Sequence, residues 1–194
     1  LVVPVAVQAG PDEDFLGATK AFRTGNAARL GAYADRLHGH LLEPYVLYYQ
    51  LRMRLEDASP EAVRDFVDTH RDSPVSEQLR SEWLKVLGRK QQWDLFDDEM
   101  RNVRDPDIEL TCYSLQSRAR SSPDAALEEA RPLWFVPRPL PESCTPLMNA
   151  LRDSGALSPE DIWLRIRYAL ERGHVTRARQ LARYLPKGEA RSEE

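Results

Sequence analysis

The sequence predicts an all-α protein, a solenoid of irregular helix hairpins, and three observations support this fold class. Helix-forming Ala, Leu, Arg and Glu are abundant, whereas glycine occurs only 9 times in 194 residues. Apolar residues recur at intervals of three and four along most of the chain, which is the period of one helix face. Most of the 14 prolines lie where helices would begin or end, and no segment is a convincing strand.

The first helices follow from breaks in the apolar pattern. Helices are expected over 12–24 and 27–37, because Gly25-Asn26 interrupts the period between them. The segment 41–55 is apolar on almost all sides, which is typical of a helix buried between neighbours. Ser59-Pro60-Glu61 then provides a hydroxyl cap, a first-turn proline and an acid near the positive end of the helix dipole, so another helix begins there.

Helical patterns continue to residue 135. They start near Ser73-Pro74, Trp93, Ile108 and Ser122-Pro123. Pro132 lies inside the last of these patterns and predicts a kink or an early end near Arg131. Residues 136–146 are rich in proline and are expected to form an extended connection that contains Cys144.

The stretch 144–186 is predicted to form three consecutive amphipathic helices. The middle one starts at Ser158-Pro159-Glu160-Asp161 and is expected to place Trp163, Ile166 and Leu170 on one face. Helical pairs therefore recur over 12–37, 41–70, 74–103, 106–135 and 147–185. Stacked pairs that bury their apolar faces against their neighbours form an α-solenoid.

The two ends of the chain differ from this pattern. Residues 1–10 are apolar, uncharged and far shorter than a membrane span. They are interpreted as a signal-peptide remnant, an expression leftover or an apolar arm packed on the domain. The expected organisation is then a helical domain over 11–186, which is part of a superhelix, and a polar tail over 187–194 at a truncated end.

Composition and motifs exclude several classes of function. The net charge is −4 and the pI is near 5.7, so no basic surplus indicates nucleic acid or an anionic membrane surface as a partner. The sequence has no P-loop, no GxGxxG and no GxSxG. No catalytic residue, cofactor or metal is therefore predicted.

Three short polar runs are candidate sites. His38-Gly39-His40 offers too few ligands for a metal, so a solvated helix end is the stronger interpretation. Asp97-Asp98-Glu99 and Glu128-Glu129 supply carboxylates, which a glycosidase needs in a pair across a cleft. Adjacent residues on a helix point about 100° apart, so these runs are predicted to be solvated faces.

Tryptophans and arginines also allow two interpretations each. The tryptophans could line a sugar-binding surface, but their spacing matches the apolar faces and favours core packing. They are Trp83, Trp93, Trp134 and Trp163. Arginines of the last two helices could face an anionic polymer or a partner domain, but a solvated face balanced by nearby acids is preferred. They are Arg165, Arg167, Arg172, Arg177, Arg179 and Arg183.

The chain has two cysteines, Cys112 and Cys144. In an exported protein an even count favours a disulfide, which would stabilise the fold by roughly 3–4 kcal/mol through loop closure. In a cytosolic protein the same pair would be two buried thiols.

Several pieces resemble the large soluble lytic transglycosylases of Gram-negative bacteria. Residues 41–55 are similar to a helix in the N-terminal region of that family, and Glu109 to Tyr113 resembles its QCxY piece. Cys144-Thr145-Pro146-Leu147 resembles its CDxLF piece, and Leu164 to Gly173 resembles LxRIRLAMxxGN. Order and spacing agree from about residue 14 to residue 186.

This resemblance implies a right-handed α-superhelix, the start of a U-shaped helical domain in a periplasmic enzyme. It also implies a disulfide between Cys112 and Cys144. In the family, a separate lysozyme-like domain cleaves the bond between N-acetylmuramic acid and N-acetylglucosamine of peptidoglycan, leaving 1,6-anhydromuramyl ends. The catalytic motifs of that domain do not occur in this sequence, so the resemblance carries over no catalytic residue.

The expected function is a non-catalytic helical scaffold fragment of a periplasmic peptidoglycan lytic transglycosylase. Its expected partners are peptidoglycan glycan strands and the missing linker and catalytic domains, with no nucleic acid and no membrane span. The alternative is a stand-alone helical-repeat adaptor that binds a protein or peptide. A third hypothesis is a small helical enzyme in its own right.

Overall fold

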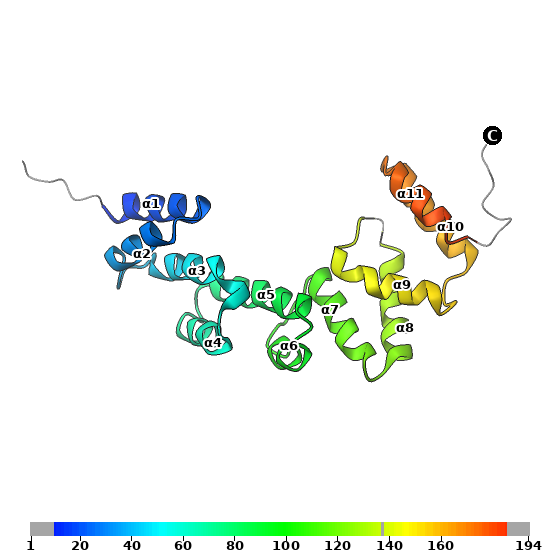
Figure 1. Cartoon of the computed structure of the whole chain (residues 1–194), viewed down its shortest axis with the longest axis horizontal. Helices are drawn as coiled ribbons and strands as arrows, with labels where there is room; N and C mark the ends of the chain where they lie inside the picture. Colours follow the sequence, from blue (N-terminus) through cyan, green and yellow to red (C-terminus); the bar gives the residue numbers. More distant parts are fainter. Residues whose placement is uncertain (1–9, 137, 186–194) are drawn as a thin grey trace, which may run out of the picture. The chain divides into compact units, whose positions relative to one another are not determined.

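The computed structural model describes residues 10–136 and 138–185. Within these ranges the chain forms eleven α-helices and two 3-10 helices, and no described residue lies in a strand (Figure 1). The predicted all-α class of helix hairpins is confirmed. None of the helices in the described ranges is both long and apolar enough to span a membrane. The proposed signal remnant and the polar tail lie outside the described residues, except Gly10, which directly precedes the first helix.

The chain divides into two compact units, residues 1–86 and 87–194. The helices of the first unit are α1 (Pro11–Arg23), α2 (Ala27–Arg36), α3 (Glu43–Met53), η1 (Leu55–Asp57), α4 (Pro60–Thr69) and α5 (Pro74–Arg89), which ends just beyond the boundary. Helices α1, α2 and α3 pack around one apolar core. The first predicted hairpin, over 12–37, therefore forms, and α3 packs against it. The buried members of this core are Ala18, Ala21, Leu30, Ala34, Leu37 and Val46.

Local capping explains where helices of the first unit begin. The Asn26 side chain accepts a hydrogen bond from the backbone N–H of Arg29 at 2.9 Å, so α2 starts directly after the predicted break. The hydroxyl of Ser59 accepts from the N–H of Ala62 at 3.2 Å, which confirms the predicted start of α4. The helix predicted over 41–55 is shorter, since α3 begins at Glu43.

The second unit contains six α-helices and one 3-10 helix in its described part. They are α6 (Trp93–Met100), α7 (Ile108–Ala119), α8 (Pro123–Trp134), η2 (Glu142–Cys144), α9 (Thr145–Asp153), α10 (Pro159–Glu171) and α11 (Val175–Ala182). Hairpins α7–α8 and α10–α11 are its main helix pairs, and α9 packs against α8 (Figure 1). The predicted pair over 106–135 therefore forms, and α10 pairs with α11 within the predicted stretch 147–185.

Two local expectations in the second unit differ from the structure. Helix α8 continues past Pro132 to Trp134, so it does not end early near Arg131. The proline removes the one hydrogen bond that its missing N–H would make, and only two helical residues follow it. Cys144 does not lie in an extended connection. It ends the 3-10 helix η2, which leads directly into α9 at Thr145.

The buried face of α10 also differs from the predicted one. Ile162, Ile166 and Ala169 are buried, whereas 39% of Trp163 and 50% of Leu170 are exposed. Of the three residues expected on the inner face, only Ile166 is buried. The buried stripe of this helix, Ile162, Ile166 and Ala169, is therefore shifted by about one residue from the predicted stripe of Trp163, Ile166 and Leu170.

Candidate functional site

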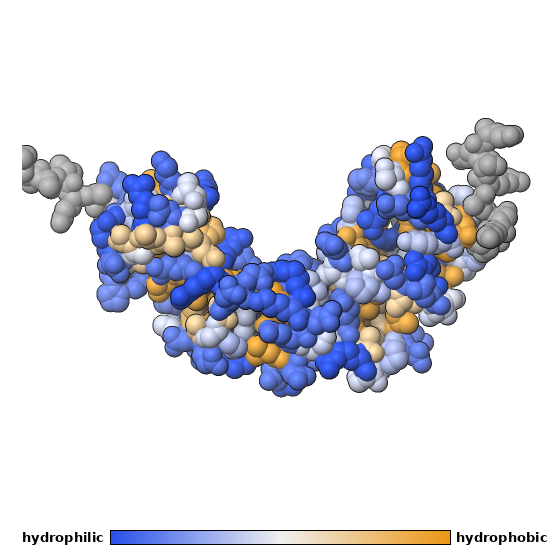
Figure 2. Space-filling view, in the orientation of Figure 1, coloured by the Kyte–Doolittle hydropathy of each residue, from blue (hydrophilic) through white to orange (hydrophobic). Residues whose placement is uncertain are grey.

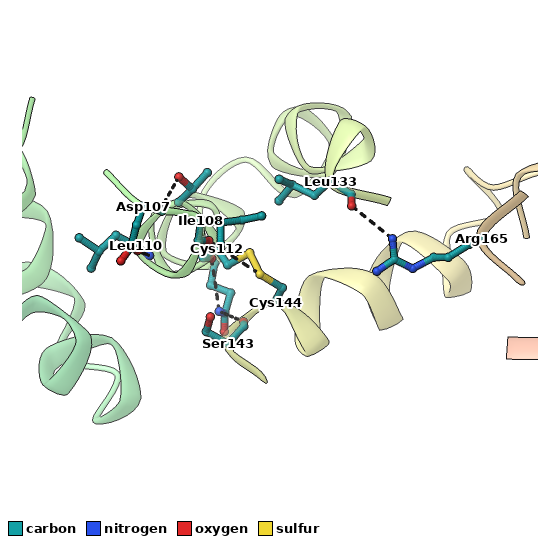
Figure 3. Close-up of a disulfide and its surroundings, with 10 residues drawn as sticks. Asp107, Ile108, Leu110, Cys112, Leu133, Ser143, Cys144 and Arg165 are labelled. Atoms are coloured by element: carbon teal, nitrogen blue, oxygen red, sulfur yellow. Dashed lines mark hydrogen bonds between the residues drawn. A yellow bond between two sulfur atoms is a disulfide. The ribbon is translucent and has the colours of Figure 1, made fainter. Parts of the chain in front are cut away.

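A disulfide between Cys112 of α7 and Cys144 of η2 lies inside the apolar core of the second unit (Figure 3). Both cysteines are fully buried, and their Cα atoms are 5.0 Å apart. The Gln116 amide reinforces this junction, since its Nε2 donates to the carbonyl of Ser143 at 2.7 Å. The connection after α8 is thus held against α7 by one covalent bond and one side-chain hydrogen bond.

The end of α8 is held by a buried arginine from α10. Arg165 is only 6% exposed. Its Nη1 donates to the carbonyl of Trp134 and, at longer range, to those of Leu133 at 3.4 Å and Val136 at 3.5 Å. The guanidinium lies 5.1 Å from the centroid of the Trp134 ring. Carbonyls at a helix end lack intrahelical partners and carry partial negative charge, so this position suits a cation.

The start of α10, which the sequence places at Ser158-Pro159, is fixed by a capping box. Ser158 Oγ accepts from the N–H of Asp161 at 3.2 Å, and Asp161 Oδ2 accepts from the N–H of Ser158 at 3.1 Å. The same carboxylate pairs with Arg131 Nη2 at 2.9 Å, and the Trp134 indole donates to the Asp161 carbonyl at 2.9 Å. Helix α10 is therefore docked on α8 at both charged and aromatic positions.

A cavity of about 190 Å³ lies between the end of α8, the η2–α9 segment and the α10–α11 hairpin. Its wall includes Trp134, Leu140, Cys144, Thr145, Met148, Asn149, Arg165, Arg177, Gln180, Leu181 and Tyr184. A smaller hollow shares Arg165 and Arg177 with it and adds Arg138, Tyr168, Arg172 and His174. We call the two together the arginine pocket.

The arginine pocket is positively charged. No Asp or Glu is among the described residues that line either hollow. Burial, together with the positive charge of Arg177, lowers the pKa of Arg165 to about 10. The group still carries its proton near neutral pH, so a cation is held in a largely buried position next to a second cation.

Sequence reasoning placed Arg165 on a solvated face, and the structure shows this to be wrong. Its spacing from Ile162, Ile166 and Ala169 puts it on the same helix face as these buried residues, which is the signal that could have indicated its burial. The other five arginines of this group are exposed.

The two histidines of the candidate metal run instead make local contacts just before and at the start of α3. His38 Nδ1 lies 2.7 Å from Glu43 Oε1, and the other carboxylate oxygen of Glu43 accepts from the N–H of Gly39 at 2.8 Å. His40 Nδ1 accepts from the N–H of Leu42 at 3.2 Å. The described part of the chain contains no group of three or more His, Cys, Asp or Glu side chains that could hold a metal ion.

The acidic runs make separate contacts, and Glu99, only 4% exposed, does not lie on the predicted solvated face. Asp97 accepts from the Ser117 hydroxyl at 2.7 Å, and Asp98 pairs with Arg101 at 3.0 Å. Glu129 forms a bidentate pair with Arg118 on the exposed side of the α7–α8 hairpin. Among the described contacts, these three carboxylates have structural partners.

The tryptophans divide into core and surface residues. Trp83 and Trp134 are each 2% exposed, so core packing is confirmed for these two. Trp93 is half-buried and meets the Phe96 ring edge-on with centroids 6.0 Å apart. The prediction of core packing is wrong for Trp163, which is 39% exposed.

No family model matches the chain. Among curated proteins it is 27% identical over 154 residues to a soluble lytic murein transglycosylase of Salmonella typhimurium and 26% identical to that of Escherichia coli K12. Each match covers 77% of this chain and 23% of the relative. The chain thus spans about a quarter of the length of the curated relatives it matches.

Solved structures of lytic transglycosylases are also similar to this chain. An inactive mutant of the lytic transglycosylase Slt from Pseudomonas aeruginosa matches with a TM-score of 0.70 and 31% identity, over 89% of this chain and 28% of that one. The 70-kDa soluble lytic transglycosylase of Escherichia coli matches with a TM-score of 0.72 and 22% identity, over 93% and 30%. The complex of a 70-kDa soluble lytic transglycosylase with bulgecin A gives 0.72 and 21%, over 92% and 29%.

Proposed function

We propose that this chain, a homologue of the soluble lytic murein transglycosylases over most of its length, is a non-catalytic helical scaffold from a periplasmic enzyme of that family. One observation carries the proposal. The chain is 31% identical over 89% of its length to a lytic transglycosylase of which it covers only 28%. This likeness supports a role for the chain as a helical portion of such an enzyme.

The chemistry of the described residues supports a scaffold role and gives less support to a catalytic role. Cleavage of a glycosidic bond requires a carboxyl group positioned beside that bond in a cleft. Asp97 and Glu129, which the sequence offers as candidates, are engaged by Ser117 and Arg118, and the larger cavity is lined by arginine and neutral side chains. In the proposed enzyme, residues 11–186 position glycan strands for a separate catalytic domain.

The disulfide supports the proposed periplasmic location. Disulfides persist in oxidising compartments, and cytosolic thiols are kept reduced. The buried Cys112–Cys144 bond therefore suits an exported protein. Residues 1–10 are proposed to be the remnant of the signal that exports it.

Binding and cleavage assays on purified peptidoglycan test the proposal. The chain is expected to sediment with intact sacculi and to release no anhydromuropeptides detectable by mass spectrometry. A full-length soluble lytic transglycosylase serves as the positive control for product release. Release of anhydromuropeptides by this chain alone would contradict the scaffold role, and failure to sediment with sacculi would contradict glycan binding.

A stand-alone adaptor is the second candidate, and the exposed apolar side chains of Trp163 and Leu170 on α10 favour it. The coding sequence beyond Glu194 distinguishes the two. An open frame that encodes a lysozyme-like domain supports the scaffold of an enzyme, and a stop codon supports the adaptor.

A further inference from the structure

The arginine pocket gathers cations from three separate segments of the second unit. Arg138 comes from the connection after α8, Arg165 and Arg172 from α10 and its C-terminal cap, and Arg177 from α11. The tight turn at Gly173, with φ of 74°, folds α11 back on α10. The turn thereby brings the arginines of these two helices together. Figure 2 shows that hydrophilic residues cover much of the surface over this hairpin.

These arginines differ from others in the same unit. Arg118, Arg131 and Arg152 each have a carboxylate partner, from Glu129, Asp161 and Asp153 respectively. In the described part of the pocket wall there is no such carboxylate. A buried cation without an anion is costly, and a neighbouring cation raises that cost further.

Arg165 retains N–H donors that are not used in its hydrogen bonds to the end of α8. Its described hydrogen bonds to the carbonyls at the end of α8 all use Nη1, and Figure 3 shows the one to Leu133. A guanidinium has five N–H groups, and Nε and Nη2 have no acceptor among the described residues. Arg165 lines both hollows, so these donors are available to a ligand there.

We propose that the arginine pocket binds the carboxylate of a peptide, held between Arg165 and Arg177. The planar fork of a guanidinium matches the two oxygens of a carboxylate. Neutral groups that can bond to neighbouring amides line the larger cavity beside it, among them Asn149, Gln180 and Tyr184. On the basis of the proposed function, this ligand is a free carboxylate of a peptidoglycan stem peptide, so the pocket would hold strands by their peptides.

Titration of the 194-residue chain by NMR tests the pocket directly. The probe is the stem tripeptide L-Ala-γ-D-Glu-meso-diaminopimelate, compared with the same peptide with amidated carboxyl groups. Saturable shifts of α10 and α11 amides are expected with the acid and not with the amide. Arg177→Gln should weaken binding about tenfold or more, since it removes a charge-assisted hydrogen bond.

Arg179→Gln is the matched control, because Arg179 is exposed on the same helix and does not line the pocket. It should change the affinity less than about twofold, since exposed charges outside the site are screened by salt. Arg177 is also exposed, so both variants should keep the wild-type melting temperature.

Equal weakening by the two variants, or equal binding of acid and amide, would overturn the proposal. Inorganic phosphate that competes as strongly as the peptide acid would also overturn it.

The sacculus assay separates this proposal from the proposed function. If the chain does not sediment with sacculi but binds the tripeptide, and Arg177→Gln weakens that binding, the scaffold function is wrong and the carboxylate site stands. If sacculi bind wild type and Arg177→Gln equally and the tripeptide does not bind, the pocket proposal is wrong and the scaffold function stands.

Discussion

Gly88 of α5 should tolerate no side chain, and replacing it with alanine tests the packing around Tyr113. A Cβ atom at Gly88 would lie 2.4 Å from Cγ of the Tyr113 ring, so the ring would have to move by about 1 Å to reach ordinary contact. Tyr113 is buried, and Phe96 meets it edge-on with centroids 6.3 Å apart. Overpacking of this kind costs about 1–3 kcal/mol, against a gain of about 1 kcal/mol in helix propensity. Gly88→Ala should therefore bring no net stabilisation and should destabilise the fold by up to about 2 kcal/mol.

Gly31→Ala in α2 is the matched control, because the nearest neighbouring atom would be Gln50 Nε2 at 3.9 Å. This change should stabilise the protein by about 0.5–1 kcal/mol through helix propensity alone. Urea unfolding followed by circular dichroism measures both free energies. A Tyr113→Ala background should relieve the cost of Gly88→Ala, which a double-mutant cycle detects. If Gly88→Ala stabilises the protein as Gly31→Ala does, the close approach of Tyr113 is refuted.

Three further predictions concern a disulfide, a cap and a buried hydroxyl. The double change Cys112→Ala with Cys144→Ala should lower the free energy of unfolding in urea by about 3–4 kcal/mol, because the bond joins positions 32 residues apart. Thiol labelling of the native protein, read by intact mass, should modify neither cysteine before reduction, and modification of both would contradict the bond. Ser158→Ala should cost about 1 kcal/mol in thermal unfolding, because the α10 capping box is lost, and an unchanged melting temperature would count against that role. Tyr48→Phe should cost about 1–2 kcal/mol in urea, since the hydroxyl donates to Glu82 at 2.9 Å, and a neutral effect would show that solvent replaces this bond.

Helix starts were predictable from sequence because capping acts over a few residues. Ser59 and Ser158 each precede a proline, and α4 and α10 begin at those prolines as expected. The start of α3 was placed two residues early. Leu41 is 86% exposed outside the helix, and Glu43 bonds to His38 instead, a side-chain contact that periodicity does not contain.

The inner face of α10 could not be predicted from the size of its apolar side chains. Ile162 and Trp163 are adjacent, so two overlapping stripes both include Ile166. Which stripe is buried depends on α8, because Arg165 bonds to carbonyls at the end of that helix and stacks on Trp134. Sequence rules usually place a charged residue at the surface. Here the carbonyls at the end of α8, which lack helical partners, accept hydrogen bonds from Arg165 and allow it to be buried.

The sequence by itself determined that this protein is helical and where several of its helices begin. These features depend on propensity, period and caps, which are properties of neighbouring residues. Only the tertiary structure decided that Arg165 is buried and that it shares a pocket with Arg138 and Arg177. That arrangement depends on packing between segments far apart in the chain, so no local pattern contains it.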